Sequence, residues 1–309
     1  MDQPPGLWWW GCMGESMVGE TLPDTICVAQ DINQSLGFLP AALAEKPGAG
    51  PFVAVVKSRN ELLRWLGKPL GSPQWIQIEG LLDDPDAWLT SCASQVPLDI
   101  VLSNPASEFS DLYRLTDVCA MRDVRVSMPA TPGFLKAVTL AASLRLPVRI
   151  IPGQPTPEML VELTEALEFY LHEPMVEMPV EFFHSLLATG CGADHGSLWI
   201  ILEEDPAAFL HYDAEGHTEL PRSGSFQSVK ISPELFVEHH FMNLVEQDAE
   251  CATCPWQQPC RGYFKWPDPA YSCRGVKQLF SRIDEAADEI KRDLANREAE
   301  LHLIARDKR

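Results

Sequence analysis

The feature that most constrains the fold is a repeat of short apolar runs through the middle of the chain. These runs are rich in β-branched residues and begin at Phe52, Trp75, Leu98, Asp123 and Pro147, roughly every 23–25 residues. Each run predicts a buried strand. Segments of helical character separate the runs, at 59–66, 83–93, 109–120 and 133–143. Strands that alternate with helices predict a parallel sheet with right-handed crossovers.

The number of repeats predicts an α/β fold of the partial-barrel type. The repeating region ends near residue 170, whereas a complete eight-fold barrel usually needs about 250 residues. One further repeat is expected upstream, near Ile26. Residues 1–172 are therefore predicted to form a partial (β/α)6-type TIM barrel. The turns after the predicted strands contain Pro, Gly and Asn, with Glu79 as the main ionisable side chain, so no rich acid–base constellation is expected at that face.

The pattern changes after Glu173, and this change predicts a small α+β domain over residues 173–275. A strand is predicted at 197–202, and a hairpin is predicted at 209–220. A short helix is then expected at 233–245, ahead of the segment that contains most of the cysteines.

A long amphipathic helix is predicted from residue 276 to about residue 304, and residues 276–309 form the last unit of the chain. Its apolar side chains recur at helical spacing on one face: Leu279, Phe280, Ile283, Ala286, Ala287, Ile290 and Leu294. The opposite face is dense in charged residues. This pattern is typical of a helix that docks on the preceding domains, and it also fits a helix that binds a partner.

Four cysteines late in the sequence predict a metal site. Cys251 and Cys254 form a Cys-x2-Cys turn, and Cys260 and Cys273 can complete a four-sulfur cage. Four thiolates suit a tetrahedral structural Zn²⁺ ion or a [4Fe–4S] cluster. Small structural zinc sites more often show two Cys-x2-Cys pairs. One pair with two solitary cysteines therefore favours the iron–sulfur cluster.

The spacing of these cysteines resembles the C-terminal half of a SPASM domain. The shared pattern is Cys-x2-Cys-x5-Cys, then Arg-Gly, then a later Cys with Gly-x-Lys-x-Leu-Phe behind it. SPASM domains extend radical S-adenosylmethionine (radical SAM) enzymes, many of which modify ribosomal peptides. The resemblance implies that Cys251, Cys254, Cys260 and Cys273 hold one auxiliary [4Fe–4S] cluster, and it implies the partial barrel upstream.

The resemblance also implies that a second auxiliary cluster is lost. Phe264 stands where the family motif has its fourth cysteine, and Pro221 stands where an upstream cysteine is expected. Cys191 echoes a further upstream cysteine of that second site. One retained cluster is therefore expected.

The motif that binds the catalytic cluster of radical SAM enzymes, Cys-x3-Cys-x2-Cys, does not occur in the sequence. At the nearest window, the three positions are occupied by Cys12, Ser16 and Gly19. One cysteine cannot hold a three-thiolate site, and glycine offers no side-chain ligand. The chain is therefore predicted to be a pseudo-radical-SAM protein that does not cleave S-adenosylmethionine.

The implied function is that of a non-catalytic iron–sulfur accessory protein in peptide or protein modification, of the kind that matures ribosomally made peptides (RiPP biosynthesis). Such a protein would bind a substrate peptide, join an active enzyme in a hetero-oligomer, or relay electrons. A zinc-stapled interaction scaffold without a redox role is the first alternative. The second alternative is an enzyme that uses the cluster directly or the strand-end face around Glu79.

Composition argues against several other classes of protein. The net charge is -20, from 44 acidic and 24 basic residues, which argues against a nucleic-acid partner. No run approaches the ~20 apolar residues of a membrane helix, and the N-terminus does not resemble a secretion signal. Nine cysteines without an export signal do not suggest a disulfide framework. A cytoplasmic location is expected.

Overall fold

The computed structural model describes residues 35–44, 51–66, 73–80, 96–116, 123–225 and 232–307, with side chains described up to residue 297. Within these ranges, no helix is both long enough and apolar enough to cross a membrane. The predicted strand near Ile26, the predicted helix at 83–93 and the window at Cys12, Ser16 and Gly19 all lie outside the described residues.

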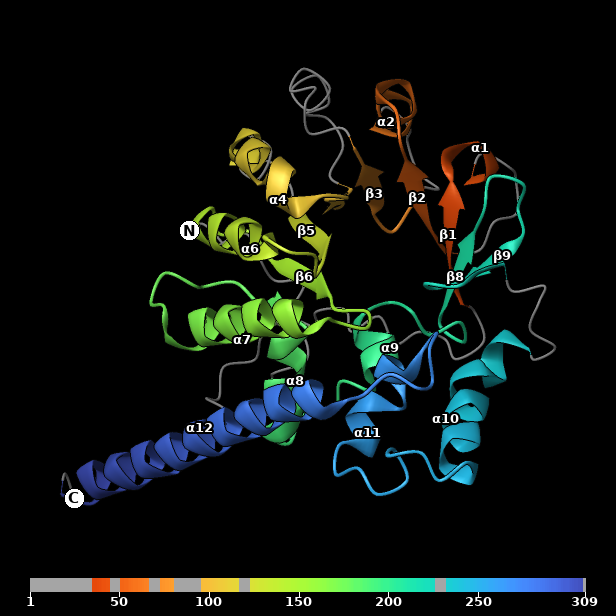
Figure 1. Ribbon diagram of the computed structural model, residues 1–309. Helices are drawn as coiled ribbons and strands as arrows, with labels where there is room; N and C mark the ends of the chain where they lie inside the picture. Colours follow the sequence, from red (N-terminus) through yellow and green to blue (C-terminus); the bar gives the residue numbers. More distant parts are fainter. Residues whose placement is uncertain are drawn as a thin grey trace.

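The described strands form one curved sheet, open on one side, that is parallel through its centre (Figure 1). Strands of the repeat region follow one another in sequence order: β1 (Leu36–Pro40), β2 (Phe52–Val56), β3 (Ile76–Glu79), β4 (Leu98–Val101), β5 (Val124–Pro129), β6 (Val148–Ile151) and β7 (Val180–Glu181). Every neighbouring pair from β1 to β7 is parallel. The five predicted strands and the partial-barrel α/β fold are therefore confirmed.

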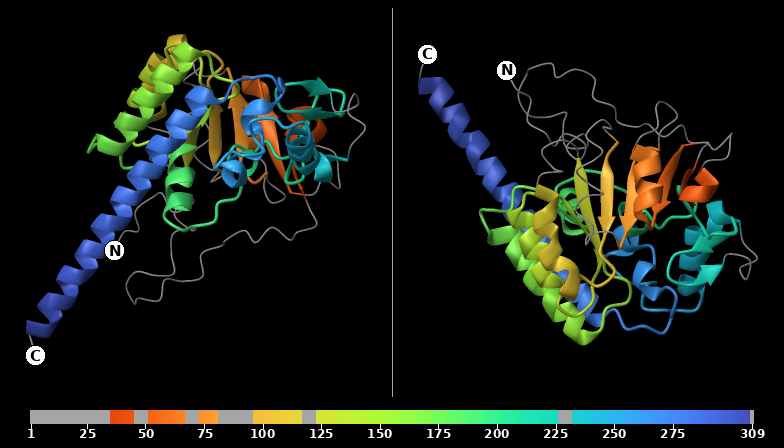
Figure 2. Two further views of the ribbon diagram at one scale, coloured as in Figure 1. Left: turned by 60° about the horizontal axis from the view of Figure 1, so that its bottom comes forward. Right: turned by 90° about the horizontal axis from the view of Figure 1, so that it is seen from above.

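Helices follow several strands and cover the outer face of the sheet (Figure 2). They are α1 (Ala41–Ala44), α2 (Arg59–Leu66), α4 (Pro105–Glu108), the 3-10 helix η1 (Phe109–Leu115), α6 (Phe134–Ser143) and α7 (Pro157–His172). The main core lies between these helices and one face of the strands, where residues such as Ile100, Val126 and Val148 are at most 1% exposed. Because side chains alternate along a strand, the other set of residues points into the barrel interior.

The sheet does not end at residue 172. β7 pairs with β6, and β8 (Phe209–Tyr212) pairs in parallel with β1 at the opposite edge. The predicted hairpin is confirmed: β9 (Thr218–Leu220) pairs antiparallel with β8 and with β10 (Gly224–Ser225). The later part of the chain therefore completes both edges of the barrel sheet, and the division into units at 172 and 275 stays a prediction.

One predicted element of this region is wrong. Residues 197–202 do not form a strand, since Leu198–Ile201 is a short helix, α9. The apolar run packs inward through Leu198 and Trp199, both completely buried, while Ile200 faces outward. A buried strand and a buried helical turn cannot be distinguished from a short apolar run alone. In this protein, tertiary packing favours the helical turn.

The remaining helices form a lower layer in Figure 1. They are α8 (Phe183–Gly190), the 3-10 helix η3 (Pro233–Leu235), α10 (Phe236–Glu246), α11 (Gln257–Cys260), the 3-10 helix η4 (Tyr263–Lys265) and α12 (Arg274–Asp307). The predictions of a helix at 233–245 and of a long final helix are confirmed. The first half of α12 packs on α7 and α8, where Arg282 Nε donates to Glu168 Oε1 at 2.6 Å, and the second half extends away from the body.

Gly190 permits the close approach of α8 and α12. A Cβ atom at this position would lie 2.7 Å from the Cβ atom of Ala287, which cannot move without shifting helix α12. We expect Gly190→Ala to lower the free energy of unfolding by about 1–3 kcal/mol because of overpacking, measured by urea denaturation. Gly275→Ala is the matched control: its added Cβ meets the flexible end of Leu160, so the loss should be smaller. Equal losses in the two variants would contradict this account.

Candidate metal centre

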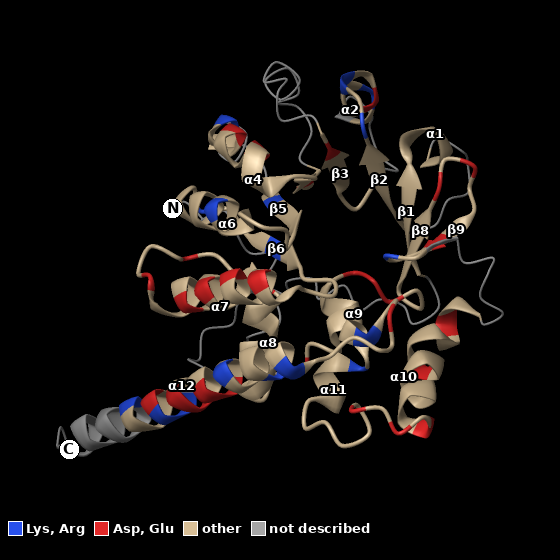
Figure 3. Cartoon of the chain, viewed as in Figure 1, with Lys and Arg blue, Asp and Glu red and all other residues tan. Residues whose placement is uncertain are grey.

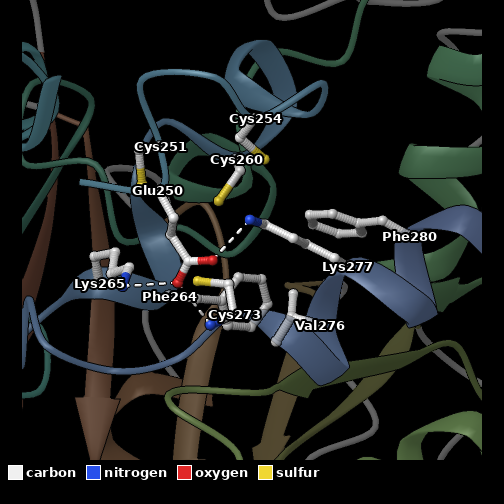
Figure 4. Close-up of a pocket in the computed structure, with 10 residues that line it drawn as sticks. All are labelled: Glu250, Cys251, Cys254, Cys260, Phe264, Lys265, Cys273, Val276, Lys277 and Phe280. Atoms are coloured by element: carbon white, nitrogen blue, oxygen red, sulfur yellow. Dashed lines mark hydrogen bonds and ion pairs between the residues drawn. The ribbon is translucent and has the colours of Figure 1, made fainter. Parts of the chain in front are cut away.

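The structure brings the four predicted cysteine ligands to one cavity (Figure 4). Cys251 and Cys254 lie on the turn after α10, where the Cys254 amide donates to the Cys251 carbonyl at 3.2 Å. Cys260 ends α11, and Cys273 immediately precedes α12. The cavity is also lined by Glu250, Phe264, Lys265, Val276, Lys277 and Phe280. Three neighbouring segments, the turn after α10, the end of α11 and the residue before α12, therefore contribute thiols to one small, partly apolar space.

The turn after Cys260 brings backbone amides near its sulfur. Arg261 and Gly262 both adopt left-handed backbone conformations, with φ of 46° and 74°. The backbone amides of Gly262, Tyr263 and Phe264 lower the pKa of the Cys260 thiol, although burial outweighs them. Amides near a thiolate stabilise its negative charge, and such surroundings tune thiolate-bound metals. Glycine suits position 262 because a φ of 74° is strained for residues that carry a Cβ atom, and a Cβ atom there would also lie 2.7 Å from Leu244 Cδ1.

A carboxylate with two lysines borders the same cavity. Glu250 accepts hydrogen bonds from the Cys273 amide at 2.9 Å and from Lys277 Nζ at 2.7 Å, and it forms an ion pair with Lys265 Nζ at 2.9 Å. Burial alone would raise the pKa of Glu250, but these hydrogen bonds outweigh burial and lower the pKa to about 2. Two ammonium groups and one carboxylate leave a net charge of +1 beside the four sulfurs.

The thiols by themselves resist ionisation. The pKa of Cys260 is raised to about 11, mainly by burial and partly by Cys251. The pKa of Cys273 is raised to about 12, mainly by burial and then by Glu250 and the nearby sulfurs. A bound metal supplies the positive charge that stabilises thiolates, and thiolates are the ligand form of cysteine. The all-cysteine donor set, the amides at Cys260 and the positive border therefore fit a thiolate-bound metal group. Within the described ranges, no group of three or more His, Cys, Asp or Glu side chains lies close enough together to bind a single metal ion.

Other predicted positions lie elsewhere. Cys191 is exposed and does not line the cavity; its Sγ atom lies 3.8 Å from the Ala287 carbonyl oxygen. Phe264, at the position of the fourth motif cysteine, forms part of the cavity wall and is 1% exposed. Glu79 pairs with Lys57 at 2.9 Å at the end of β3.

The structure also shows a charged cluster that the sequence interpretation missed. Asp99 on β4, Arg125 on β5 and Arg149 on β6 point into the barrel, where Glu203 meets them from the segment after α9. All four are at most 8% exposed. The prediction considered the turns after the strands, whereas these residues lie within the strands. The sequence feature that could have identified the three strand residues is a charged residue inside an apolar run, as in Leu-Asp-Ile-Val, Val-Arg-Val and Val-Arg-Ile.

The cavity lined by the four cysteines contacts the barrel through hydrogen bonds. Gln154, in the turn after β6, donates to the carbonyl oxygens of Phe264 and Asp268 at 3.0 and 2.8 Å. Tyr271 donates its hydroxyl to the Pro155 carbonyl oxygen at 2.7 Å. The cysteine segment therefore lies against the carboxyl end of a barrel strand, which is the edge where α/β folds place their sites.

No protein-family model matches this chain, and no curated protein matches it in sequence. In structure, it is similar to native anSMEcpe with bound AdoMet, with a TM-score of 0.52 and 12% sequence identity over 79% of this chain and 87% of that one. It is similarly related to native anSMEcpe with bound AdoMet and Cp18Cys peptide, with a TM-score of 0.50, 13% identity and coverage of 81% and 89%. At this identity, the likeness shows the fold alone, a partial α/β barrel with a central parallel sheet.

Proposed function

We propose that this chain is a non-catalytic iron–sulfur accessory protein in peptide modification. The observation that carries this proposal is the convergence of Cys251, Cys254, Cys260 and Cys273 on one cavity beside a barrel of the radical SAM type. These four cysteines would hold a [4Fe–4S] cluster. When bound, such a cluster can accept and donate one electron.

The residues around the cysteines favour a buried anionic group. The amides at Cys260 and the lysines at 265 and 277 would offset the negative charge of four thiolates. Phe264, Val276 and Phe280 would limit the access of water, and such hydrophobic surroundings control the redox potential. The all-cysteine donor set also suits Zn²⁺, which would leave a stapled scaffold. The iron, zinc and acid-labile sulfide content of the purified protein separates the cluster from the zinc ion.

The missing Cys-x3-Cys-x2-Cys motif supports a non-catalytic role. Reductive cleavage of S-adenosylmethionine needs a cluster held by three cysteines, and the sequence has no such triplet. The partner proposed is a peptide substrate or an active modifying enzyme, since a related fold has been solved with bound peptide, the Cp18Cys complex of anSMEcpe. A strongly acidic chain suits a basic peptide or a basic surface on that enzyme.

We expect the anaerobically reconstituted protein to produce no 5′-deoxyadenosine from S-adenosylmethionine and dithionite. The physical reason is that its cluster would have four cysteine ligands and no open iron site for the substrate. Product analysis by liquid chromatography checks this, with protein stripped of metal as the background control. Formation of 5′-deoxyadenosine above that background would contradict the non-catalytic role and favour a radical enzyme.

A further inference from the structure

We propose that Glu203 is an internal plug of the barrel, and that the arginine pair that holds it is a binding site for the carboxylate group of a small ligand. Glu203 lies between Arg125 and Arg149, which project from adjacent strands β5 and β6. Figure 3 shows basic positions on these two strands and an acidic segment beside α9. This inference concerns the barrel interior and is independent of the metal cavity.

The geometry of this arginine pair is that of carboxylate recognition. Arg125 donates from Nη1 and Nη2 to the two carboxylate oxygens of Glu203, at 2.7 and 3.1 Å. Arg149 donates to Glu203 Oε2 from Nη1. A guanidinium that grips both oxygens of a carboxylate gives directional as well as electrostatic recognition. The site therefore recognises the carboxylate group, whichever molecule supplies it.

The arginines are preorganised by residues other than Glu203. Asp99 Oδ2 accepts hydrogen bonds from Arg125 Nη2 at 2.7 Å and from Arg149 Nη2 at 2.9 Å. Ser127 accepts from Arg149 Nε at 3.0 Å and donates to Asp99 Oδ1 at 2.5 Å. These contacts would remain if Glu203 were withdrawn.

The charges require an anion at the position of Glu203. Two guanidinium groups face two carboxylates, so removal of the Glu203 carboxylate would leave a buried charge of +1. Glu204, the adjacent acid, pairs instead with Arg222 at 3.0 Å. Glu181 is engaged elsewhere, since its Oε2 atom accepts a hydrogen bond from the Ser185 amide at 3.2 Å. A buried unpaired guanidinium is costly, and an external carboxylate would remove that cost.

Glu203 is separable from the site it fills. It comes from the segment after α9, outside the strands that carry the arginines, and its backbone is left-handed, with φ of 60°. A left-handed conformation is unfavourable for a non-glycine residue. It is held by the arginine pair and by His211 Nε2, which lies 3.0 Å from the Glu203 carbonyl oxygen.

The interior offers further polar atoms for a ligand. Gln77 lies opposite Asp99 in the sheet register, and Arg125 lies over the ring of Trp75 at 5.8 Å. Gln77 Oε1 and Trp75 Nε1 are buried and have no hydrogen-bond partner in the part of the chain that the structure describes. A ligand whose carboxylate replaces Glu203 could therefore donate to Gln77 and accept from Trp75.

The test is chemical rescue of Glu203→Gly, which removes the plug and relieves the left-handed backbone. We expect its Tm to rise by several degrees in sodium acetate, in a saturable way, relative to equal concentrations of sodium chloride. Wild type, with its site filled, should respond equally to both salts. The double variant Glu203→Gly with Arg149→Met keeps the cavity but loses half of the arginine pair, so it should lose the acetate response.

Equal Tm values for Glu203→Gly in acetate and chloride would overturn the proposal. So would an equal acetate effect in the double variant. If Glu203→Gly does not fold in chloride, the proposal requires that it fold in acetate, and failure in both salts would also overturn it. None of these outcomes depends on the metal content of the protein, so failure here is distinguishable from failure of the proposed function.

Discussion

Replacing Cys254 with alanine is expected to abolish the metal group of this protein. Anaerobically purified wild type should contain about four iron and about four sulfide per chain, as a [4Fe–4S] cluster requires. Cys254 lies with the other three cysteines at one cavity, and a cluster with one thiolate missing exposes an iron to solvent and is labile. The measurement is iron, zinc and acid-labile sulfide content, together with the broad visible absorbance of a cluster.

The matched control for Cys254→Ala is Cys191→Ala. Cys191 is exposed and lies outside the cavity, so this variant should retain the full iron and sulfide content. About one zinc per chain without sulfide would contradict the iron–sulfur proposal and leave a zinc-stapled scaffold. Loss of iron in both variants would instead place Cys191 at the site, against the geometry described above.

Replacing Arg149 with methionine is expected to destabilise the fold by about 3–5 kcal/mol, because the two buried carboxylates of Asp99 and Glu203 would then share one guanidinium group, that of Arg125. Arg149 is 3% exposed and contacts Asp99, Ser127 and Glu203. The free energy of unfolding in urea, measured at neutral pH, reports this loss. Arg145→Met is the control: Arg145 is exposed and forms a surface ion pair with Glu177, so the loss of stability should be below about 1 kcal/mol.

The difference in free energy of unfolding between wild type and Arg149→Met should depend on pH, because Asp99 and Glu203 both titrate. Burial would raise the pKa of Asp99 and of Glu203, but the guanidinium groups of Arg125 and Arg149 outweigh burial and hold both values below the ordinary 3.8 and 4.5. A lowered pKa gives stability that is present above the ordinary value and is lost as the pH falls through the folded value. The gap between wild type and Arg149→Met should therefore narrow below about pH 4. A gap that stays constant into acid would contradict the ionised network.

The strands and the long helix could be predicted because each follows a local rule. β2 to β6 begin within one residue of the predicted starts, and α12 follows the apolar spacing from Val276 onward. β1 was missed because Leu-Gly-Phe-Leu-Pro carries Gly and Pro, which weaken a strand signal, and only its pairing with β2 and β8 identifies it. α9 was assigned to the wrong class for a similar reason, because packing around Trp199 decides its conformation.

The sequence alone determined the spacing of the barrel strands, the amphipathic pattern of the last helix and the choice of the four cysteines as one candidate ligand set. Spacing encodes these features locally, since a strand, a helix face and a Cys-x2-Cys turn each need only neighbouring residues. Tertiary structure alone decided which charges meet. Asp99, Arg125 and Glu203 come from segments up to 104 positions apart, and only sheet register and the turn after α9 bring them within hydrogen-bond distance. Contacts between distant segments depend on the whole fold, and no local pattern specifies them.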